Sequence, residues 1–266
     1  MSGVETVAPG VGRLDLRTPT LPPATHTNAV LLGRGRLTVV DPASPWPDEQ
    51  ARLVAALGAL GTVERIVLTH HHADHVGGVE ALRAALGDVP VVAHPVTADL
   101  LRGEVRVDAT LDEGDVLDAD GVTLDVLHTP GHAAGHLVLH DRASDVMVAG
   151  DMVAGVGTIL VDPREGDLGD YLASLTRLQK RRPGALVPSH GPTLADGVTV
   201  LGFYVAHRHL RTQQIREAID RHGPRPALEL VPLVYGPELD PAAWPVAAVQ
   251  IEAHLVWMAK QGMLPA

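Results

Sequence analysis

The chain has 266 residues, a formal net charge of −11 and no cysteine. This length allows one large α/β domain with an appendage and a sizeable hydrophobic core. The missing cysteines exclude disulfides, thiolate metal ligands and thiol nucleophiles, and the acidic charge argues against a general nucleic-acid-binding surface. Residues 1–5 lack the basic start and apolar core of a signal peptide, and no apolar run approaches membrane-spanning length. We therefore expect a cytoplasmic protein that does not enter a membrane.

The N-terminal part of the chain predicts short strands followed by a helix. Residues 1–41 alternate apolar stretches with glycine and proline, which is typical of strands joined by turns. Residues 47–60 open with a proline and two acidic residues and continue with apolar residues at helical spacing, which predicts an amphipathic helix. Between them, Asp41 precedes Pro42. Its carboxylate could support a metal ligand or simply form the turn, and the sequence leaves both open.

Residues 69–78 carry the clearest chemical signal, because they place four ligand-type side chains in the pattern H-x-H-x-D-H. The preceding residues 65–69 are mostly apolar and β-branched, as in a buried strand, and residues 79–86 have a helical pattern. The histidines therefore lie on a strand-to-helix turn, where ligand-binding residues collect in α/β sheets.

The spacing of this motif suggests two metal ions close together. His70 and His72 are two residues apart on an extended turn and can point toward one ion, whereas the neighbours Asp74 and His75 diverge and can reach a second. Imidazole with carboxylate suits zinc, with iron or manganese as alternatives. The competing interpretation is a solvated histidine-rich loop, but chance rarely produces this pattern directly after a buried strand.

Three later strands each deliver one ligand-type residue at their end. The residues are His132 in Thr-Pro-Gly-His after 122–127, Asp151 after 146–150, and His190 after 185–188. Each is weak evidence alone, but with the first motif they supply two sets of three ligands and a carboxylate able to bridge. His94 also ends a predicted strand, where it could face the site or be hydrogen-bonded at its rim.

In this order and spacing, the motifs H-x-H-x-D-H, T-P-G-H, G-D and S-H-G resemble the metallo-β-lactamase-fold hydrolases over about residues 25–215. The resemblance implies a four-layer αβ/βα sandwich and two divalent metal ions, zinc first, with iron or manganese as alternatives. It assigns one metal to His70, His72 and His132, the other to Asp74, His75 and His190, and a bridging role to Asp151. Asp74 would also orient the nucleophile. We expect His136 either to donate a proton to the leaving group or to support a ligand.

Within this superfamily, residues 155–158, 170–175 and 207–215 resemble the β-lactamase-like protein 2 branch, near the glyoxalase II hydrolases. A mitochondrial member of that branch is a single-strand-selective endoribonuclease, and many bacterial members have no settled substrate. The resemblance implies a small helical, winged-helix-like cap at the C-terminus. We accordingly expect a catalytic domain over residues 1–200 and the cap over residues 201–266.

The predicted helix around residue 208 offers candidate substrate contacts. Tyr204, His207, Arg208 and Arg211 share one face at helical spacing, next to a mostly apolar stripe. They could hold an anionic group such as phosphate or carboxylate above the metals. The alternative is an ordinary solvated helix face.

These observations predict a metal-dependent hydrolase in which a hydroxide bridging two divalent ions attacks an ester, thioester, lactone or similar small-molecule bond. The alternative reaction is phosphodiester cleavage of single-stranded RNA. An alternative of another class is a metal-containing nucleic-acid-binding or regulatory protein without turnover, but a complete ligand set favours an enzyme. The acidic charge favours a small-molecule substrate, expected to be anionic, over nucleic acid. The sequence does not indicate the oligomeric state.

Overall fold

The computed structural model describes residues 3–264 and contains two mixed β-sheets that face each other. The first sheet has the order β1-β2-β3-β4-β5-β6-β7 and the second the order β13-β12-β11-β10-β9-β8. The strands of the first sheet are β1 (Glu5–Ala8), β2 (Val11–Arg17), β3 (His26–Leu32), β4 (Arg36–Val40), β5 (Thr62–Val67), β6 (Val91–Ala93) and β7 (Ala109–Thr110). Those of the second are β8 (Val116–Asp118), β9 (Thr123–His128), β10 (Leu137–Asp141), β11 (Val146–Gly150), β12 (Ala185–Pro188) and β13 (Leu194–Ala195).

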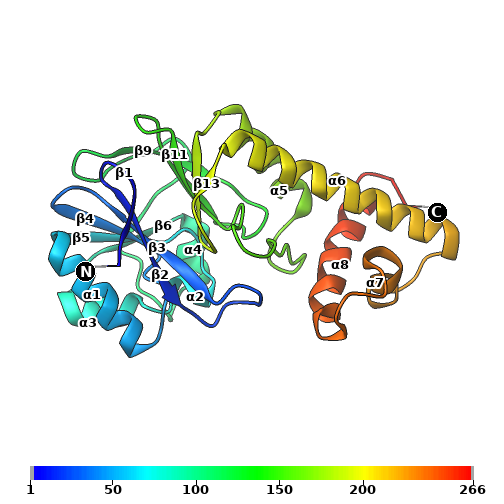
Figure 1. Cartoon of the computed structure of the whole chain (residues 1–266), viewed down its shortest axis with the longest axis horizontal. Helices are drawn as coiled ribbons and strands as arrows, with labels where there is room; N and C mark the ends of the chain where they lie inside the picture. Colours follow the sequence, from blue (N-terminus) through cyan, green and yellow to red (C-terminus); the bar gives the residue numbers. More distant parts are fainter. Residues whose placement is uncertain (1–2, 265–266) are drawn as a thin grey trace.

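Helices cover the outer faces of both sheets (Figure 1). Beside the first sheet lie α1 (Pro47–Leu60), α2 (Ala73–Val76), α3 (Val79–Leu86) and α4 (Pro95–Leu100). The second sheet is covered by α5 (Leu168–Lys180) and the first part of α6 (Gly197–His222). The C-terminal helices are α7 (Ala227–Tyr235), the short 3₁₀ helix η1 (Pro241–Ala243) and α8 (Trp244–Lys260). The helices expected over 47–60 and 79–86 are confirmed.

The strands alternate their side chains between two cores, which produces the four layers. Along β5, Ile66 packs toward α1 and α3, whereas its neighbour Val67 enters the core between the sheets. In that central core Val67 lies among residues of the second sheet such as Val148 and Val187. The αβ/βα sandwich expected from the sequence is therefore confirmed.

The long helix α6 joins the sandwich to the C-terminal region (Figure 1). Leu201 and Tyr204 near its start pack with α5, while Ile215 and Ile219 in its second half pack with α7 and α8. The expected cap is helical, but the described residues 201–264 contain no strand, so the wing of a winged helix is missing. The domain boundary set at 200/201 falls inside α6, which runs through it without a break.

No helix among residues 3–264 is long and apolar enough to span a bilayer.

Candidate metal centre

The seven residues expected to bind metal lie together at one edge of the sandwich. They follow the ends of β5 in the first sheet and of β9, β11 and β12 in the second, where the parallel neighbours β11 and β12 bring their carboxyl ends to the same side. Among these seven residues three groups of three have ligand atoms within 4.8 Å of one another, and one of them, His70, His75 and Asp151, joins the other two. The first ligand set is His70, His72 and His132, and the second ligand set is Asp74, His75 and His190.

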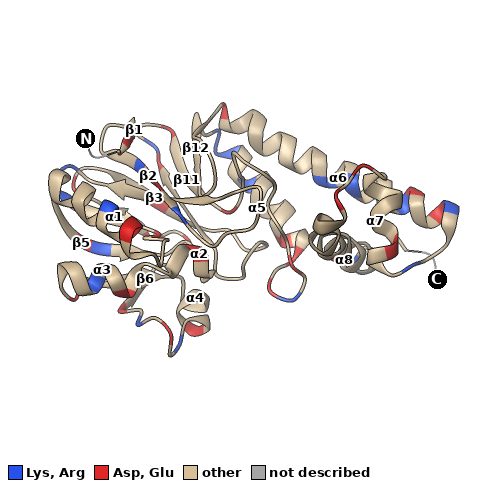
Figure 2. Cartoon of the chain, turned by 60° about the horizontal axis from the view of Figure 1, so that its bottom comes forward, with Lys and Arg blue, Asp and Glu red and all other residues tan. Residues whose placement is uncertain are grey.

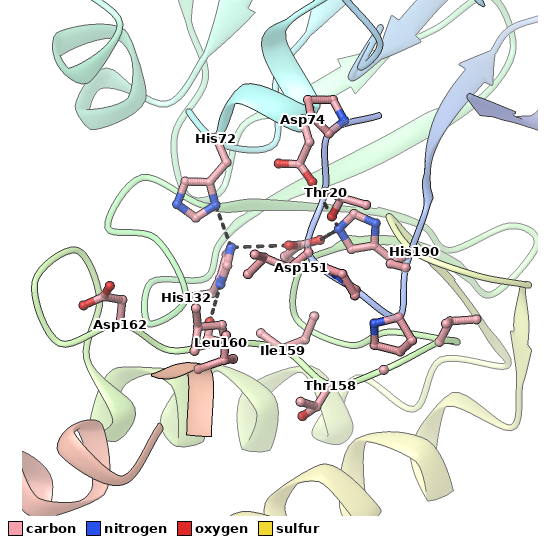
Figure 3. Close-up of a pocket in the computed structure, with 18 of the residues that line it drawn as sticks. Thr20, His72, Asp74, His132, Asp151, Thr158, Ile159, Leu160, Asp162 and His190 are labelled. Carbon is pink, nitrogen blue, oxygen red and sulfur yellow. Dashed lines mark hydrogen bonds and ion pairs between the residues drawn. The ribbon is translucent and has the colours of Figure 1, made fainter. Parts of the chain in front are cut away.

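The nitrogens of the first ligand set converge on one point, and Figure 3 shows His72 and His132 directed at each other. His70 Nε2 lies 2.9 Å from His72 Nδ1, and His132 Nε2 lies 3.3 Å and 3.0 Å from these two atoms. In a tetrahedral zinc complex with Zn–N bonds of about 2.0–2.1 Å, ligand nitrogens lie about 3.3 Å apart. The three imidazoles are therefore spaced as the ligands of one ion.

The opposite nitrogen of each ring has a hydrogen-bond partner that fixes its tautomer. His132 Nδ1–H donates to the Leu160 carbonyl at 2.7 Å, and His72 Nε2–H donates to Glu165 Oε2 at 3.0 Å. These bonds leave the convergent nitrogens without a proton. Burial lowers the pKa of both histidines, which keeps them neutral, as a metal requires.

Asp41 supports a ligand of each set, which answers the question that its sequence position left open. Its Oδ2 accepts the Nδ1–H of His75 at 2.8 Å and the hydroxyl of Thr69 at 2.6 Å. The Thr69 oxygen in turn lies 3.0 Å from Nδ1 of His70 and can accept its proton. The buried Asp41 thus orients His75 directly and His70 through Thr69.

The ligand atoms of the second ligand set also point toward one common position. His75 Nε2 is buried without a hydrogen-bond partner and lies 3.9 Å from Asp74 Oδ1. His190 donates its Nδ1–H to the His26 carbonyl at 2.9 Å, and its Nε2 lies 3.6 Å from Asp74 Oδ2. Asn28 of β3, in the first sheet, donates to the Pro188 carbonyl at the end of β12 and holds the turn that carries His190.

Asp151 lies between the two ligand sets. Its Oδ2 is 3.4 Å from His132 Nε2, whereas its Oδ1 is 3.7 Å from His75 Nε2 and 3.5 Å from His190 Nε2. Oδ1 is buried and accepts no hydrogen bond. A buried carboxylate oxygen without a hydrogen bond destabilises the folded protein unless a cation binds to it. This arrangement fits the bridging role that the resemblance implied.

The electrostatics of the centre favour bound cations. Burial opposes a charge on His75, but Asp151, Asp74 and Asp41 together raise its pKa to about 10. Burial likewise opposes ionisation of Asp151, yet the neighbouring His75, His190 and His132 hold its pKa well below the usual range. The Asp151 carboxylate therefore stays ionised and attracts positive charge, which divalent ions would supply. The residues present fit two such ions.

The contacts of His136 favour the second of its two expected roles, support of a ligand, over donation of a proton to the leaving group. His136 Nε2 accepts the backbone N–H of Asp151 at 3.0 Å, and its Nδ1–H donates to Thr129 Oγ1 at 2.7 Å. The ring is fully buried, does not line the cavity, and has a pKa that burial lowers well below its usual value. A Cβ at Gly150, whose φ is +52°, would lie 2.4 Å from His136 Nε2, so glycine permits this contact.

A cavity of about 450 Å³ opens next to the ligands (Figure 3). Three stretches form its walls: the loop 19–24, the residues 156–160, and Val246 with Gln250 from α8. Of these, the family resemblance had singled out only residues 156–158. Most of these residues are apolar. The lining contains no lysine or arginine, and its charged residues besides the metal-site carboxylates are Asp162 and Glu165. Proline-rich and apolar stretches of this kind carry no chemical motif that could have marked them beforehand.

The four residues expected to contact substrate do not line this cavity. The Tyr204 hydroxyl bonds to the backbone of Ala154, and the ring of His207 stacks on Phe203. Arg208 is buried against the Ile159 carbonyl and Gln250, while Arg211 donates to the Val234 carbonyl inside the cap. Tyr204, Arg208 and Arg211 thus contact protein groups, whereas the half-buried His207 stacks on the exposed Phe203 of its own helix.

His94 lies outside the metal centre, as the rim interpretation expected. Its Nδ1 accepts the backbone N–H of Val96 at the start of α4, and its ring stacks on His128 with the centroids 4.0 Å apart. Its Nε2 lies 3.3 Å from Asp112. Two parallel stacked rings cannot both aim a lone pair at one ion, so we assign no metal to this group.

Comparisons with known proteins agree with this geometry. The sequence model of the Metallo-beta-lactamase superfamily matches residues 22–190. The chain is 30% identical to a protein named "Beta-lactamase-like protein 2 homolog" of Drosophila melanogaster, over 90% of the chain and 84% of that protein. It is 29% identical to a protein named "Atrochrysone carboxyl ACP thioesterase" of Claviceps purpurea, over 89% and 76%. A crystal structure of a beta-lactamase domain protein from Burkholderia ambifaria superposes with a TM-score of 0.84 at 25% identity, covering 98% of this chain and 89% of the other.

Proposed function

The chain belongs to the metallo-beta-lactamase superfamily, and on this premise we propose that it hydrolyses esters or thioesters with an uncharged, apolar acyl group, using two divalent metal ions. The observation that carries the proposal is the cavity beside the ligands, which has apolar walls and no cationic side chain in its lining. A carbonyl substrate needs an apolar surface for its acyl group and an electrophilic centre at the scissile bond. The cavity and the adjoining ligand sets offer both.

The first ligand set would hold one ion and the second ligand set the other, with Asp151 between them. Zinc suits three imidazoles, and iron or manganese are alternatives for the more carboxylate-rich second set. When bound, such ions supply Lewis acidity and lower the pKa of a water molecule to about 7.

The protein's own groups would position and deprotonate the reactants. Asp74 lines the cavity and faces His190, so its carboxylate can orient an attacking water and receive its proton. The loop 19–24 and residues 156–160 would enclose the acyl group and exclude bulk water, which strengthens electrostatic interactions at the reacting carbonyl.

The same lining argues against a phosphodiester substrate. Proteins neutralise nucleic-acid phosphates mainly with lysine and arginine. The charged side chains that line this cavity besides the metal-site carboxylates are the acidic Asp162 and Glu165. Positive and negative residues are interspersed along the ribbon in Figure 2. The thioesterase name of the Claviceps relative gives independent support for an acyl thioester. We therefore propose an uncharged acyl group in place of the anionic group expected from residues 204–211.

The test compares acyl thioesters with RNA. Protein loaded with zinc or manganese is given acetyl, hexanoyl and decanoyl thioesters of N-acetylcysteamine and, separately, a short single-stranded RNA. We expect hydrolysis of the thioesters, with longer acyl chains preferred, and loss of this activity in Asp74→Ala. RNA cleavage that disappears in Asp74→Ala, with intact thioesters, would overturn the proposal.

A further inference from the structure

His132 and His72 each donate the N–H that faces away from the metal position to an acceptor in one irregular segment of the chain. We call such an acceptor the outer partner of a ligand. This wall segment, residues 156–166, contains no helix or strand. Its Leu160 carbonyl accepts the proton of His132 Nδ1, and its Glu165 accepts the proton of His72 Nε2. Because no sheet or helix fixes the segment, the orientation of these two histidines depends on what else holds it.

Two buried side chains of the C-terminal region hold the wall segment at Ile159. The Ile159 carbonyl accepts hydrogen bonds from Arg208 Nη2 at 2.5 Å and from Gln250 Nε2 at 2.6 Å. Arg208 Nη1 also donates to Gln250 Oε1 at 3.1 Å, so the three groups bond to one another in a closed triangle. Arg208 lies on α6 and Gln250 on α8, and both are buried. The residue next to Ile159 is Leu160, the partner of His132.

The burial of Arg208 restricts it to this position. Among the described residues no carboxylate forms an ion pair with its guanidinium, which lies instead 5.2 Å from the ring centroid of Tyr171. Tyr171 is fixed in turn, because its hydroxyl donates to the Met152 carbonyl. A buried charge is tolerated only where its hydrogen bonds are made, and charge-assisted bonds are the stronger kind. The Ile159 carbonyl is therefore a main partner of this charge.

We propose that Arg208 and Gln250 are positioning residues for the first metal position. They fix the Ile159 carbonyl and, through the adjacent Leu160 carbonyl, the direction of the His132 ring. The inference rests on the proposed metal centre and adds to it a link from the C-terminal helices. The second ligand set has no such link, because its outer partners, Asp41 and the His26 carbonyl, belong to the first sheet and its connections.

The test measures zinc affinity in two backgrounds, each with one ligand set disabled. His75→Ala leaves the first ligand set intact, and His72→Ala leaves the second. Into each background we introduce Arg208→Met or Gln250→Leu, which remove the hydrogen bonds to Ile159 at similar volume. Zinc affinity of the metal-free protein is determined by competition with a chromophoric chelator. Loss of an outer partner typically weakens metal binding 10–100-fold.

We expect about 10-fold weaker zinc binding or more in the His75→Ala background, and less than about 2-fold change in the His72→Ala background. Imidazole N–H resonances give a second readout, because the His132 Nδ1–H signal should weaken or shift when the Leu160 carbonyl moves. Unchanged zinc affinity in the His75→Ala background, or equal losses in both backgrounds, would overturn the proposal.

The matched control is Arg211→Met, on the same helix. The Arg211 guanidinium also contacts a carbonyl, that of Val234, and an aromatic ring, that of Tyr235, but both partners lie inside the C-terminal region. An equal zinc loss in this control would assign the effect to general loosening and overturn the positioning role. Gln250→Leu removes no charge, so it still tests the positioning role if Arg208→Met fails to fold. If the parent His75→Ala protein binds no zinc, the proposed metal centre itself is wrong.

Discussion

The two ligand sets are supported by different parts of the molecule. The second set relies on Asp41, which is 2% exposed at the end of a central strand, and on the carbonyl of His26 in β3. The first set relies on Leu160 and Glu165 of the wall segment, and the Glu165 side chain is 50% exposed. One metal position is thus built into the sandwich, whereas the other depends on an irregular segment and on the helices that hold it.

This difference indicates where the site can be adjusted. The wall segment also lines the cavity, so a change that moves it alters the substrate surface and the first ligand set together. A change in the first sheet would reach the second set without altering the wall segment. Asp41 is the exception to this separation, because it also reaches His70 through Thr69.

The largest effect should come from the residue that belongs to both sets. We expect Asp151→Asn to weaken zinc binding at both positions and to lower hydrolytic activity by more than about 100-fold, because even outer partners of ligands are worth 10–100-fold. Metal analysis after dialysis and thioester turnover provide the measurement. Asp118→Asn, an exposed residue of β8 outside both ligand sets and the wall segment, is the control. If Asp151→Asn retained one fully occupied position, the bridging role would be wrong.

The second largest effect should follow from Asp41→Asn. The substitution places an amide where three donors, the backbone N–H and hydroxyl of Thr69 and Nδ1–H of His75, now meet a carboxylate. We expect about 10–100-fold weaker zinc binding at the second position, a smaller loss at the first, and a lower free energy of unfolding by about 1–3 kcal/mol. Zinc titration and thermal unfolding measure these changes, with the exposed Asp118→Asn as control. Equal losses at both positions would show that Thr69 transmits the effect as strongly as the direct bond does.

A smaller effect, confined to the first position, is expected for Glu165. In Glu165→Gln an amide oxygen can still accept from His72, so zinc affinity should fall less than about 10-fold in the His75→Ala background. In Glu165→Ala zinc affinity should fall further, because this substitution removes the hydrogen-bond acceptor of His72. Chelator competition distinguishes the two variants. An effect on the His72→Ala background would contradict the assignment, since Glu165 would then act by general electrostatics.

The ligands could be predicted from sequence because each lies in a short motif directly after an apolar strand. The outer partners could not. Leu160 and Ile159 act through backbone carbonyls, which any residue possesses, and Gln250 reaches them from 91 positions away. Helical periodicity placed Arg208 and Tyr204 on a common face, but it could not show that α5, α8 and the wall segment cover that face. His136 was similarly ambiguous, because only the fold shows that it accepts the Asp151 N–H.

The smallest expected effect on the ligand sets acts through the C-terminal helices and depends on pH. His254 of α8 is fully buried and bonds to Thr212, one turn from Arg208 on α6. Burial, with Arg208 and Arg211 nearby, lowers its pKa to about 3. The unfolded chain therefore takes up a proton near pH 6.5 that the folded chain does not, so the stabilisation is complete above that pH and is lost as pH falls. At pH 5 the loss is about 2 kcal/mol for this group.

In His254→Gln, the free energy of unfolding should fall less between pH 7 and pH 5 than in the unsubstituted protein, as measured by urea unfolding at each pH. Loosening of α8 would reach the first ligand set through Gln250 and would spare Asp41. Acid should accordingly weaken the hold of the C-terminal helices on the wall segment before it disturbs the first sheet. Hydrogen exchange at pH 5 would reveal this order as earlier loss of protection in α8 than in β4 and β5. Simultaneous loss in all three would mean that the two supports unfold as one unit.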